Sequence, residues 1–153
     1  MIVQPEFLIS TTHVGTWVFV IFVSILSDLE IPILKTIAKP IGLSIFLIGM
    51  FFLYWGMVHL KGAFLGNVKP VSGKLVQSGP YKYVRHPIYL SMIISTLGLA
   101  FGMRSVWGMI ATILLFGVSS VLRGWFEEKE LVKVHGKAWD DYMERTSFFI
   151  PFM

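Results

Sequence analysis

The sequence predicts an all-α, polytopic membrane protein with about four transmembrane helices and a C-terminal amphipathic helix. Hydrophobic residues make up 55% of its 153 residues and charged residues only 14%, whereas soluble domains carry about 25% charged residues. Several apolar runs also approach the roughly 20 residues that a spanning helix needs. The mean hydropathy of +0.72 agrees with this prediction. We expect residues 1–153 to form a single membrane domain.

Four apolar segments predict the helices: residues 12–29, 40–59, 87–101 and 106–122. Residues 1–60 would hold two N-terminal spans and residues 61–86 a cytosolic loop. Residues 87–153 would hold a cofactor-binding helical hairpin and the C-terminal helix. Gly42, Gly49 and Gly56 in the second segment favour close helix packing and permit a homodimer.

The third and fourth segments are joined only by residues 102–105. So short a link forces an antiparallel hairpin. It places Pro87 and Arg123 at the same face of the membrane. Beyond the fourth segment, residues 126–144 read as one amphipathic helix that leaves the membrane or lies on it, with Trp139 and Tyr142 at headgroup level. The apolar tail, residues 148–152, is expected to tuck back onto the protein.

Basic residues predict which face is cytoplasmic. Ten of the 13 Lys and Arg residues flank one face, against Lys35, Lys39 and Arg104 on the other. The positive-inside rule then places the hairpin's open end in the cytoplasm. The net charge of +4 does not indicate nucleic acid binding, because these residues flank apolar runs instead of forming a basic stripe.

Two polar clusters flank the hairpin, residues 79–89 and residues 123–128. Polar and ionisable groups at membrane depth are costly and are usually kept for a function. Proline is favoured at the first position of a helix, so the third helix should begin at Pro87 and offer a positive end to an anion. His86 and Tyr89 would share a helix face, as would Arg123 and Glu127.

Together these groups suit a zwitterionic amino acid with a neighbouring cation, such as S-adenosylmethionine (SAM). We expect His86 and Glu127 to lie on opposite walls of one cavity. Each residue also has a plainer interpretation. Arginines at helix ends commonly snorkel to headgroups, Glu127 and Glu128 are compatible with a solvated helix end, and a lone His86 is commonly structural. His13 and His59 are assigned to that structural class. No metal site is expected, and the absence of cysteine excludes disulfides and thiolate ligands.

The combined pattern resembles the isoprenylcysteine carboxyl methyltransferase family of integral membrane enzymes, and phospholipid N-methyltransferases share related elements. The resemblance covers residues 73–151, about half the chain. The motifs that carry it are Gly79-Pro80-Tyr81, Arg85-His86-Pro87-Ile88-Tyr89, Arg123, Glu127-Glu128, Leu131, Gly136 and Tyr142.

The resemblance implies a methyltransferase with SAM as methyl donor, and an acceptor that is a lipophilic small molecule or a lipidated substrate within the membrane lipids. Carried over by motif, the cofactor-binding residues would be Lys74, Leu75, Val76, Tyr81, His86, Pro87, Ile88, Tyr89, Glu127 and Glu128. Arg85 and Arg123 would orient the substrate and serve the catalytic step.

The sequence departs from the family pattern where Ser91 replaces a glycine and Trp139 replaces a tyrosine. The N-terminal half, which would contact the substrate, is also short, so the sequence does not identify the methyl acceptor. Two alternatives remain. One is an NADPH-dependent membrane reductase of sterol-reductase type, in which Lys74 and Lys82 would supply a basic pocket. The other is a non-enzymatic small membrane protein.

Overall fold

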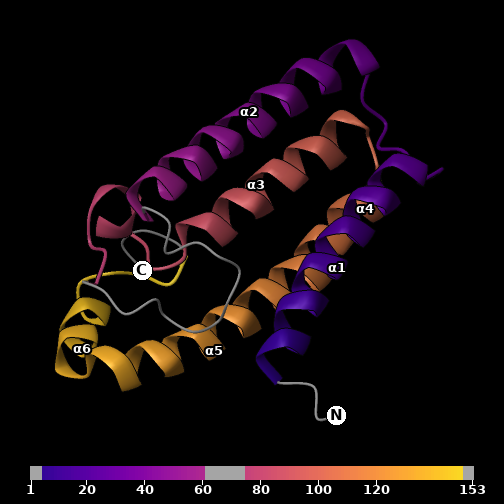
Figure 1. The fold of residues 1–153 in the computed structure, drawn as a ribbon. Helices are drawn as coiled ribbons and strands as arrows, with labels where there is room; N and C mark the ends of the chain where they lie inside the picture. Colours follow the sequence, from indigo (N-terminus) through magenta and orange to yellow (C-terminus); the bar gives the residue numbers. More distant parts are fainter. Residues whose placement is uncertain (1–4, 61–74, 150–153) are drawn as a thin grey trace.

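A computed structural model describes residues 5–60 and 75–149, which are almost entirely helical (Figure 1). Between these bounds the chain forms no β-strand, only two isolated bridges. The elements in chain order are α1 (Pro5–Leu26), α2 (Lys35–Leu60), the 3₁₀ turn η1 (Gly79–Lys82), α3 (Pro87–Gly102), α4 (Val106–Ala111), the π-helical segment η2 (Thr112–Gly117), α5 (Val118–His135) and α6 (Lys137–Met143).

Three helices in the described part of the chain are long and apolar enough to cross a membrane. They are α1 from Leu8, α2, and the continuous helix of α4, η2 and α5, Val106–His135. The remaining apolar helix, α3, has 16 residues and is therefore about 24 Å long at 1.5 Å per residue. It lies between α2 and the long helix (Figure 1). The predicted all-α polytopic membrane protein is confirmed.

The packing of α2 on α3 depends on small residues. A Cβ added to Gly49 would lie 2.9 Å from the Ser91 carbonyl oxygen. One added to Gly98 would lie 2.8 Å from the Gly42 carbonyl oxygen. The two backbones therefore approach as closely as small-residue packing allows. This face of α2 is covered by α3, so the predicted homodimer would need another surface.

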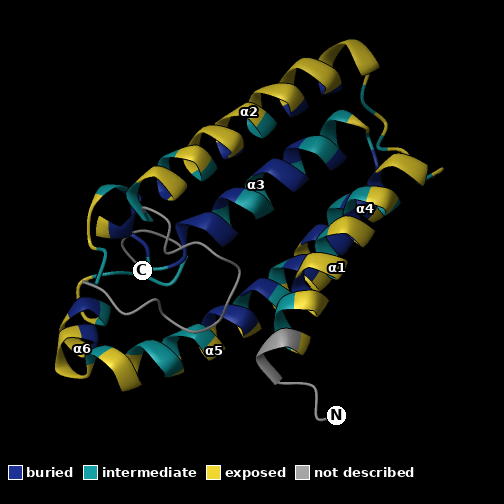
Figure 2. Cartoon of the chain, viewed as in Figure 1, coloured by how far each residue is buried: buried dark blue, intermediate teal, exposed yellow. Residues whose placement is uncertain are grey.

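Exposed residues are concentrated on α2, whereas α3 is mostly buried or half-buried (Figure 2). Large apolar side chains such as Phe51 and Leu114 are about 60% exposed, as expected where lipid is the solvent. The interior combines apolar side chains such as Phe116 with small polar residues, among them Thr112 and Ser120, which are fully buried. Their hydroxyls donate to carbonyls one turn earlier, at 2.7 Å to Gly108 and 2.8 Å to Phe116. These bonds satisfy the hydroxyls without water.

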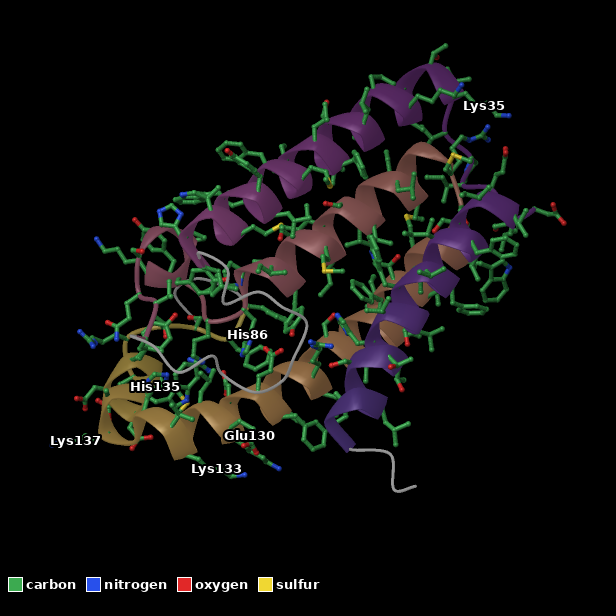
Figure 3. The ribbon with its side chains drawn as sticks, viewed as in Figure 1. Lys35, His86, Glu130, Lys133, His135 and Lys137 are labelled. Carbon is green, nitrogen blue, oxygen red and sulfur yellow. The ribbon has the colours of Figure 1, made fainter. Side chains whose placement is uncertain are left out.

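The tight α3–α4 turn is held from outside the hairpin. Arg104 has a φ of 61°, a left-handed conformation that is uncommon for a residue other than glycine. Its guanidinium binds Glu30 at 2.9 Å and the Ile31 carbonyl at 3.1 and 3.2 Å. Lys35 also approaches Glu30, at 3.8 Å. Lys35 and His86 lie at opposite ends of the bundle (Figure 3), which agrees with the predicted separation of the two faces.

The predicted bounds of four helices were wrong. The first helix, predicted over residues 12–29, begins earlier and ends earlier, at Pro5–Leu26. The second helix begins earlier than Pro40, at Lys35, and includes that proline. The long helix does not end near residue 122 but continues to His135. The predicted helix over residues 126–144 is interrupted at Gly136, whose φ of 51° no regular helix adopts. Because the chain turns there, Trp139 and Tyr142 are buried, at 2% and 3% exposure, and do not face headgroups.

Candidate active site

The two polar clusters meet where the chain enters α3. Val84 forms a parallel bridge with Ser147. The Arg85 amide donates to the Ser147 carbonyl at 2.9 Å, and the Ser147 amide donates to the Tyr83 carbonyl at 3.2 Å. The segment after α6 therefore packs along residues 83–86, and Phe148 reaches the His86 ring, with centroids 4.6 Å apart. This confirms the predicted return of the tail as far as residue 149; residues 150–153 lie outside the described part.

Glu128 on α5 joins the two clusters. Its Oε1 accepts from Arg85 Nε at 2.7 Å and lies 3.1 Å from His86 Nε2. The Glu128 side chain is 14% exposed and that of Arg85 is 13% exposed. A solvated helix end and a snorkelling arginine are both inconsistent with that burial. Arg85 also donates through Nη1 to the carbonyls of Met143 and Thr146, so it ties the C-terminal segment to the same point.

Glu127 collects a second set of donors. Its Oε1 accepts from the Tyr89 hydroxyl and from Arg123 Nε, the latter at 3.2 Å. Arg123 Nε lies 2.6 Å from the same hydroxyl, and the Arg123 side chain is only 8% exposed. The other Glu127 oxygen, Oε2, is 3.7 Å from His86 Nδ1. His86 and Glu127 are therefore in one contact network, closer than the opposite cavity walls that the sequence predicted.

We call this network the α3–α5 cluster: Arg85, His86, Tyr89, Arg123, Glu127 and Glu128. Figure 3 shows His86 where α3 begins, facing α5. The hairpin geometry explains the meeting. The three residues between α3 and α4 turn the chain back along α3, and both arms of the hairpin are helical. Charges of both signs are thereby paired beside the bundle interior.

Other predicted site residues lie around the α3–α5 cluster. Pro87 and Ile88 face α2, because a Cβ on Gly56 would lie 3.3 Å from Ile88 Cγ1 and 3.9 Å from Pro87 Cγ. Tyr81 is buried in η1, and its carbonyl accepts from the Tyr142 hydroxyl at 2.7 Å. Two further residues, Leu75 and Val76, are partly buried ahead of η1, and Lys74 lies outside the described residues.

The two tyrosines beside the cluster are neutral. Burial raises the pKa of the Tyr81 phenol and that of the Tyr142 phenol. Desolvation disfavours a phenolate in each case. Both phenols therefore keep their proton near neutral pH and add no charge to the site.

Two residues that sequence reasoning did not assign to the site lie against it. Gly124 leaves room for the imidazole, since a Cβ there would lie 3.2 Å from His86 Nε2. Its only sequence signal is a glycine inside a helix between Arg123 and Glu127. His13 of α1 lies against Tyr89, with ring centroids 5.1 Å apart. Nothing in the local sequence of α1 indicated that contact, because it depends on how α1 crosses the hairpin.

The donor set suits a zwitterion. Glu127 and Glu128 are carboxylates able to receive an ammonium or ribose hydroxyls, and the first turn of α3 offers N–H groups that lack intrahelical partners. His86 adds a side-chain nitrogen between them. Among the described residues, no group of three or more His, Asp or Glu side chains is arranged to hold a metal ion.

Comparison with known proteins agrees with this chemistry. The sequence profile of the phospholipid methyltransferase family matches residues 34–138, which include the whole α3–α5 cluster. The chain is also 32% identical over 116 residues to phosphatidylethanolamine N-methyltransferase B of Dictyostelium discoideum, with 72% of this chain and 58% of that protein covered. This chain thus spans somewhat more than half the length of that relative. The predicted membrane methyltransferase family is confirmed at this level: the chain belongs to the phospholipid methyltransferase family.

Proposed function

We propose that the protein is an integral membrane methyltransferase that transfers the methyl group of SAM to the amine of a phospholipid headgroup. The observation that carries the proposal is the α3–α5 cluster, buried within a chain that matches the phospholipid methyltransferase family over residues 34–138. The similarity to a phosphatidylethanolamine N-methyltransferase supports an amine as the acceptor. Membership of this family also favours a methyltransferase over an NADPH-dependent reductase or a non-enzymatic membrane protein.

SAM fits the residues of the cluster. When bound, it supplies a methyl carbon activated by a positive sulfur. Glu127 and Glu128 would pair with its ammonium group or ribose hydroxyls, with His86 and Tyr89 orienting these carboxylates. The start of α3 would receive its carboxylate, because a helix N-terminus favours an anion. Further predicted cofactor contacts, outside the cluster, are Lys74, Leu75, Val76, Tyr81, Pro87 and Ile88.

The arginines have different surroundings, which suggests different roles. Arg85 is bound to Glu128 and to two carbonyls of the C-terminal segment, so we infer that it orients the site. Arg123 is buried against Tyr89, with its guanidinium carbon 5.7 Å from the ring centroid. It would steer the phosphate or another anionic group of the acceptor, since a guanidinium matches such oxygens well.

A carboxylate acceptor, as in the isoprenylcysteine carboxyl methyltransferases, is the second candidate. The motif resemblance and the buried Arg123 favour it, because a guanidinium would hold an acceptor carboxylate and no proton would have to be removed. The acceptor atom distinguishes the two: nitrogen in the first case and oxygen in the second.

The test is methyl transfer in lipid nanodiscs. The purified protein is supplied with SAM labelled in its methyl group and with either phosphatidylethanolamine or a prenylated cysteine. Phosphatidylcholine, whose nitrogen is fully methylated, is the matched control lipid. We expect label in phosphatidylethanolamine alone. Label only in the prenylated cysteine would overturn the amine assignment, and label in neither substrate would overturn the proposed activity.

We further propose that the site faces the cytoplasm, since most basic residues flank that end of the bundle. The natural absence of cysteine makes this testable by single substitutions. Ser78→Cys lies beside η1, and Asp28→Cys lies at the opposite end; both positions are exposed. A membrane-impermeant maleimide added to intact cells should label Asp28→Cys and not Ser78→Cys. The reverse pattern would place the site outside.

A further inference from the structure

His13 is a buried imidazole with one unsatisfied nitrogen. It is 3% exposed, and its Nδ1 lies 3.2 Å from the Ser119 hydroxyl oxygen of α5. Its Nε2 is buried and has no hydrogen-bond partner among the described residues. Buried polar atoms are almost always paired, and an exception calls for an explanation. A ligand group that binds Nε2 during function is one such explanation.

The position of His13 connects it to the α3–α5 cluster. Its ring meets the Tyr89 ring edge to face, with centroids 5.1 Å apart, and stacks on Phe116 at 5.0 Å. The hydroxyl of Tyr89 is in turn bonded to Glu127 and Arg123. Ser119, which contacts the imidazole, precedes Arg123 by four residues on α5, so their backbone positions are about 6 Å apart along the helix.

The ionisable side chains of the α3–α5 cluster already bind one another. Glu128 is bound by Arg85 and His86, and Glu127 by Tyr89 and Arg123. His13 comes from α1, which precedes the residues 34–138 that match the family profile. Histidine is also the side chain whose charge changes most readily near neutral pH.

Methylation of an amine requires a proton acceptor. At neutral pH a primary amine is an ammonium ion, R–NH₃⁺, and has no lone pair with which to attack carbon. One N–H bond must break, with its electron pair remaining on nitrogen and its proton passing to a base. The nitrogen then bonds to the methyl carbon of a sulfonium donor. The carbon–sulfur bond breaks with its pair left on sulfur, and the product is R–NH₂⁺–CH₃.

We propose that His13 Nε2 accepts that proton, and this inference rests on the proposed function. Nδ1 then carries the hydrogen and donates to Ser119, which holds the tautomer with a free lone pair on Nε2. The imidazolium returns its proton to water when the product leaves. The charged or titratable groups that face His13 from the elements packed on α1 are Tyr89 of α3 and Arg123 of α5; α4 and η2 contain none.

The kinetic test compares the wild-type protein with His13→Gln in phosphatidylethanolamine nanodiscs at saturating SAM. Glutamine retains a hydrogen-bonding group but accepts no proton. We expect kcat at pH 7 to fall about 100-fold or more, as for loss of a general base. The acidic limb of the pH profile should move to higher pH in His13→Gln, because that variant needs amine that is already free, and its deficit in kcat should narrow as pH rises. SAM affinity should stay within about twofold, because His13 contacts no predicted SAM ligand except the Tyr89 ring.

A readout independent of turnover uses protein labelled with ¹⁵N-histidine, without SAM. The His13 signals are identified by their loss in His13→Gln. Phosphatidylethanolamine should shift the Nε2 signal, and phosphatidylcholine, which has no N–H, should not. Equal responses to the two lipids would overturn the assignment.

The outcomes separate this inference from the proposed function. If the wild-type protein methylates phosphatidylethanolamine and His13→Gln does so equally well with the same pH profile, only the role of His13 is wrong. If the wild-type protein methylates only a carboxylate, both fail. If His13→Gln loses SAM binding, the variant is misfolded and Ser119→Ala provides the test instead. This substitution keeps the imidazole but removes the hydroxyl that holds the hydrogen on Nδ1. We expect about a tenfold lower kcat with SAM affinity retained, and an unchanged kcat would count against the proposal.

Discussion

Arg85 Nε donates to Glu128 Oε1 at 2.7 Å across 43 positions of sequence. The bond joins the segment that leads into α3 to the second half of α5. Both side chains are largely buried, so the pair is less screened by solvent than a surface salt bridge. Because Arg85 also binds two carbonyls after α6, one guanidinium fixes three segments of chain around the site.

Arg85→Lys should destabilise the fold. Lysine retains a charge for Glu128 but not the planar set of donors that reaches Met143 and Thr146. We expect a loss of about 1.5–3 kcal/mol, the range for a hydrogen bond to a charged group, measured by unfolding in detergent. Arg145→Lys is the matched control, since Arg145 is exposed and bonds only one turn back, to Asp141. It should change stability by less than about 0.5 kcal/mol. Equal effects of both substitutions would contradict the inference that Arg85 holds the three chain segments together.

Glu127→Gln should weaken SAM binding. The substitution removes the charge that would hold the ammonium or ribose and leaves Arg123 without its carboxylate. A loss of about 1.5–3 kcal/mol corresponds to roughly a 10- to 100-fold rise in Kd, measured by calorimetry. Glu130→Gln, on the same helix, removes only an ion pair with the exposed Lys133 and should leave Kd unchanged. The account fails here if Glu127→Gln binds SAM as tightly as that control.

Gly124→Ala should disturb His86 without touching a charged group. The new methyl would lie 3.2 Å from His86 Nε2 and 2.5 Å from Phe148 Cζ. We expect about 1–3 kcal/mol of destabilisation from overpacking, together with weaker SAM binding. Gly117→Ala in the same long helix meets only ordinary contact, 3.5 Å from the Thr112 carbonyl oxygen. If Gly124→Ala leaves SAM affinity as high as Gly117→Ala does, SAM binding does not require the close fit of His86 against α5.

Gly49→Ala should separate α2 from α3. Its methyl would lie 2.6 Å from the Ser95 amide nitrogen and 2.9 Å from the Ser91 carbonyl oxygen. Backbone atoms cannot move aside cheaply, so we expect a loss of about 1–3 kcal/mol in thermal unfolding. Gly15→Ala in α1 has nothing within 4 Å of the new methyl and should be neutral or stabilising by up to about 1 kcal/mol. A stable Gly49→Ala protein would mean that the helices pack less closely.

Much of the arrangement was predictable because it depends on the length of one loop and on spacing along single helices. The short link over residues 102–105 forced the hairpin, and the hairpin alone brought His86 near Glu127. The spacing of Arg123 and Glu127 placed both on one helix face, where they form an ion pair at 3.2 Å. The inward face of α2 followed from its glycines. These features are local in sequence or are set by one short loop.

The remainder depends on contacts between distant segments. The break at Gly136 is visible only as one glycine in an amphipathic pattern, and that pattern continues through it. The burial of Tyr142 follows from its bond to the Tyr81 carbonyl, 61 positions away. The contact between His13 and Ser119 spans 106 positions. Periodicity along the sequence contains no information about where α1 crosses the hairpin, so the sequence predicts only a structural role for His13.

Calorimetric titration of the purified protein with SAM, with its demethylated product and with NADPH tests the central claim most directly. We predict that both sulfur compounds bind the wild-type protein, that His86→Ala weakens them by about 1.5–3 kcal/mol, and that NADPH produces no binding heat. Binding of NADPH in the absence of any binding of SAM would contradict the account and restore the reductase alternative.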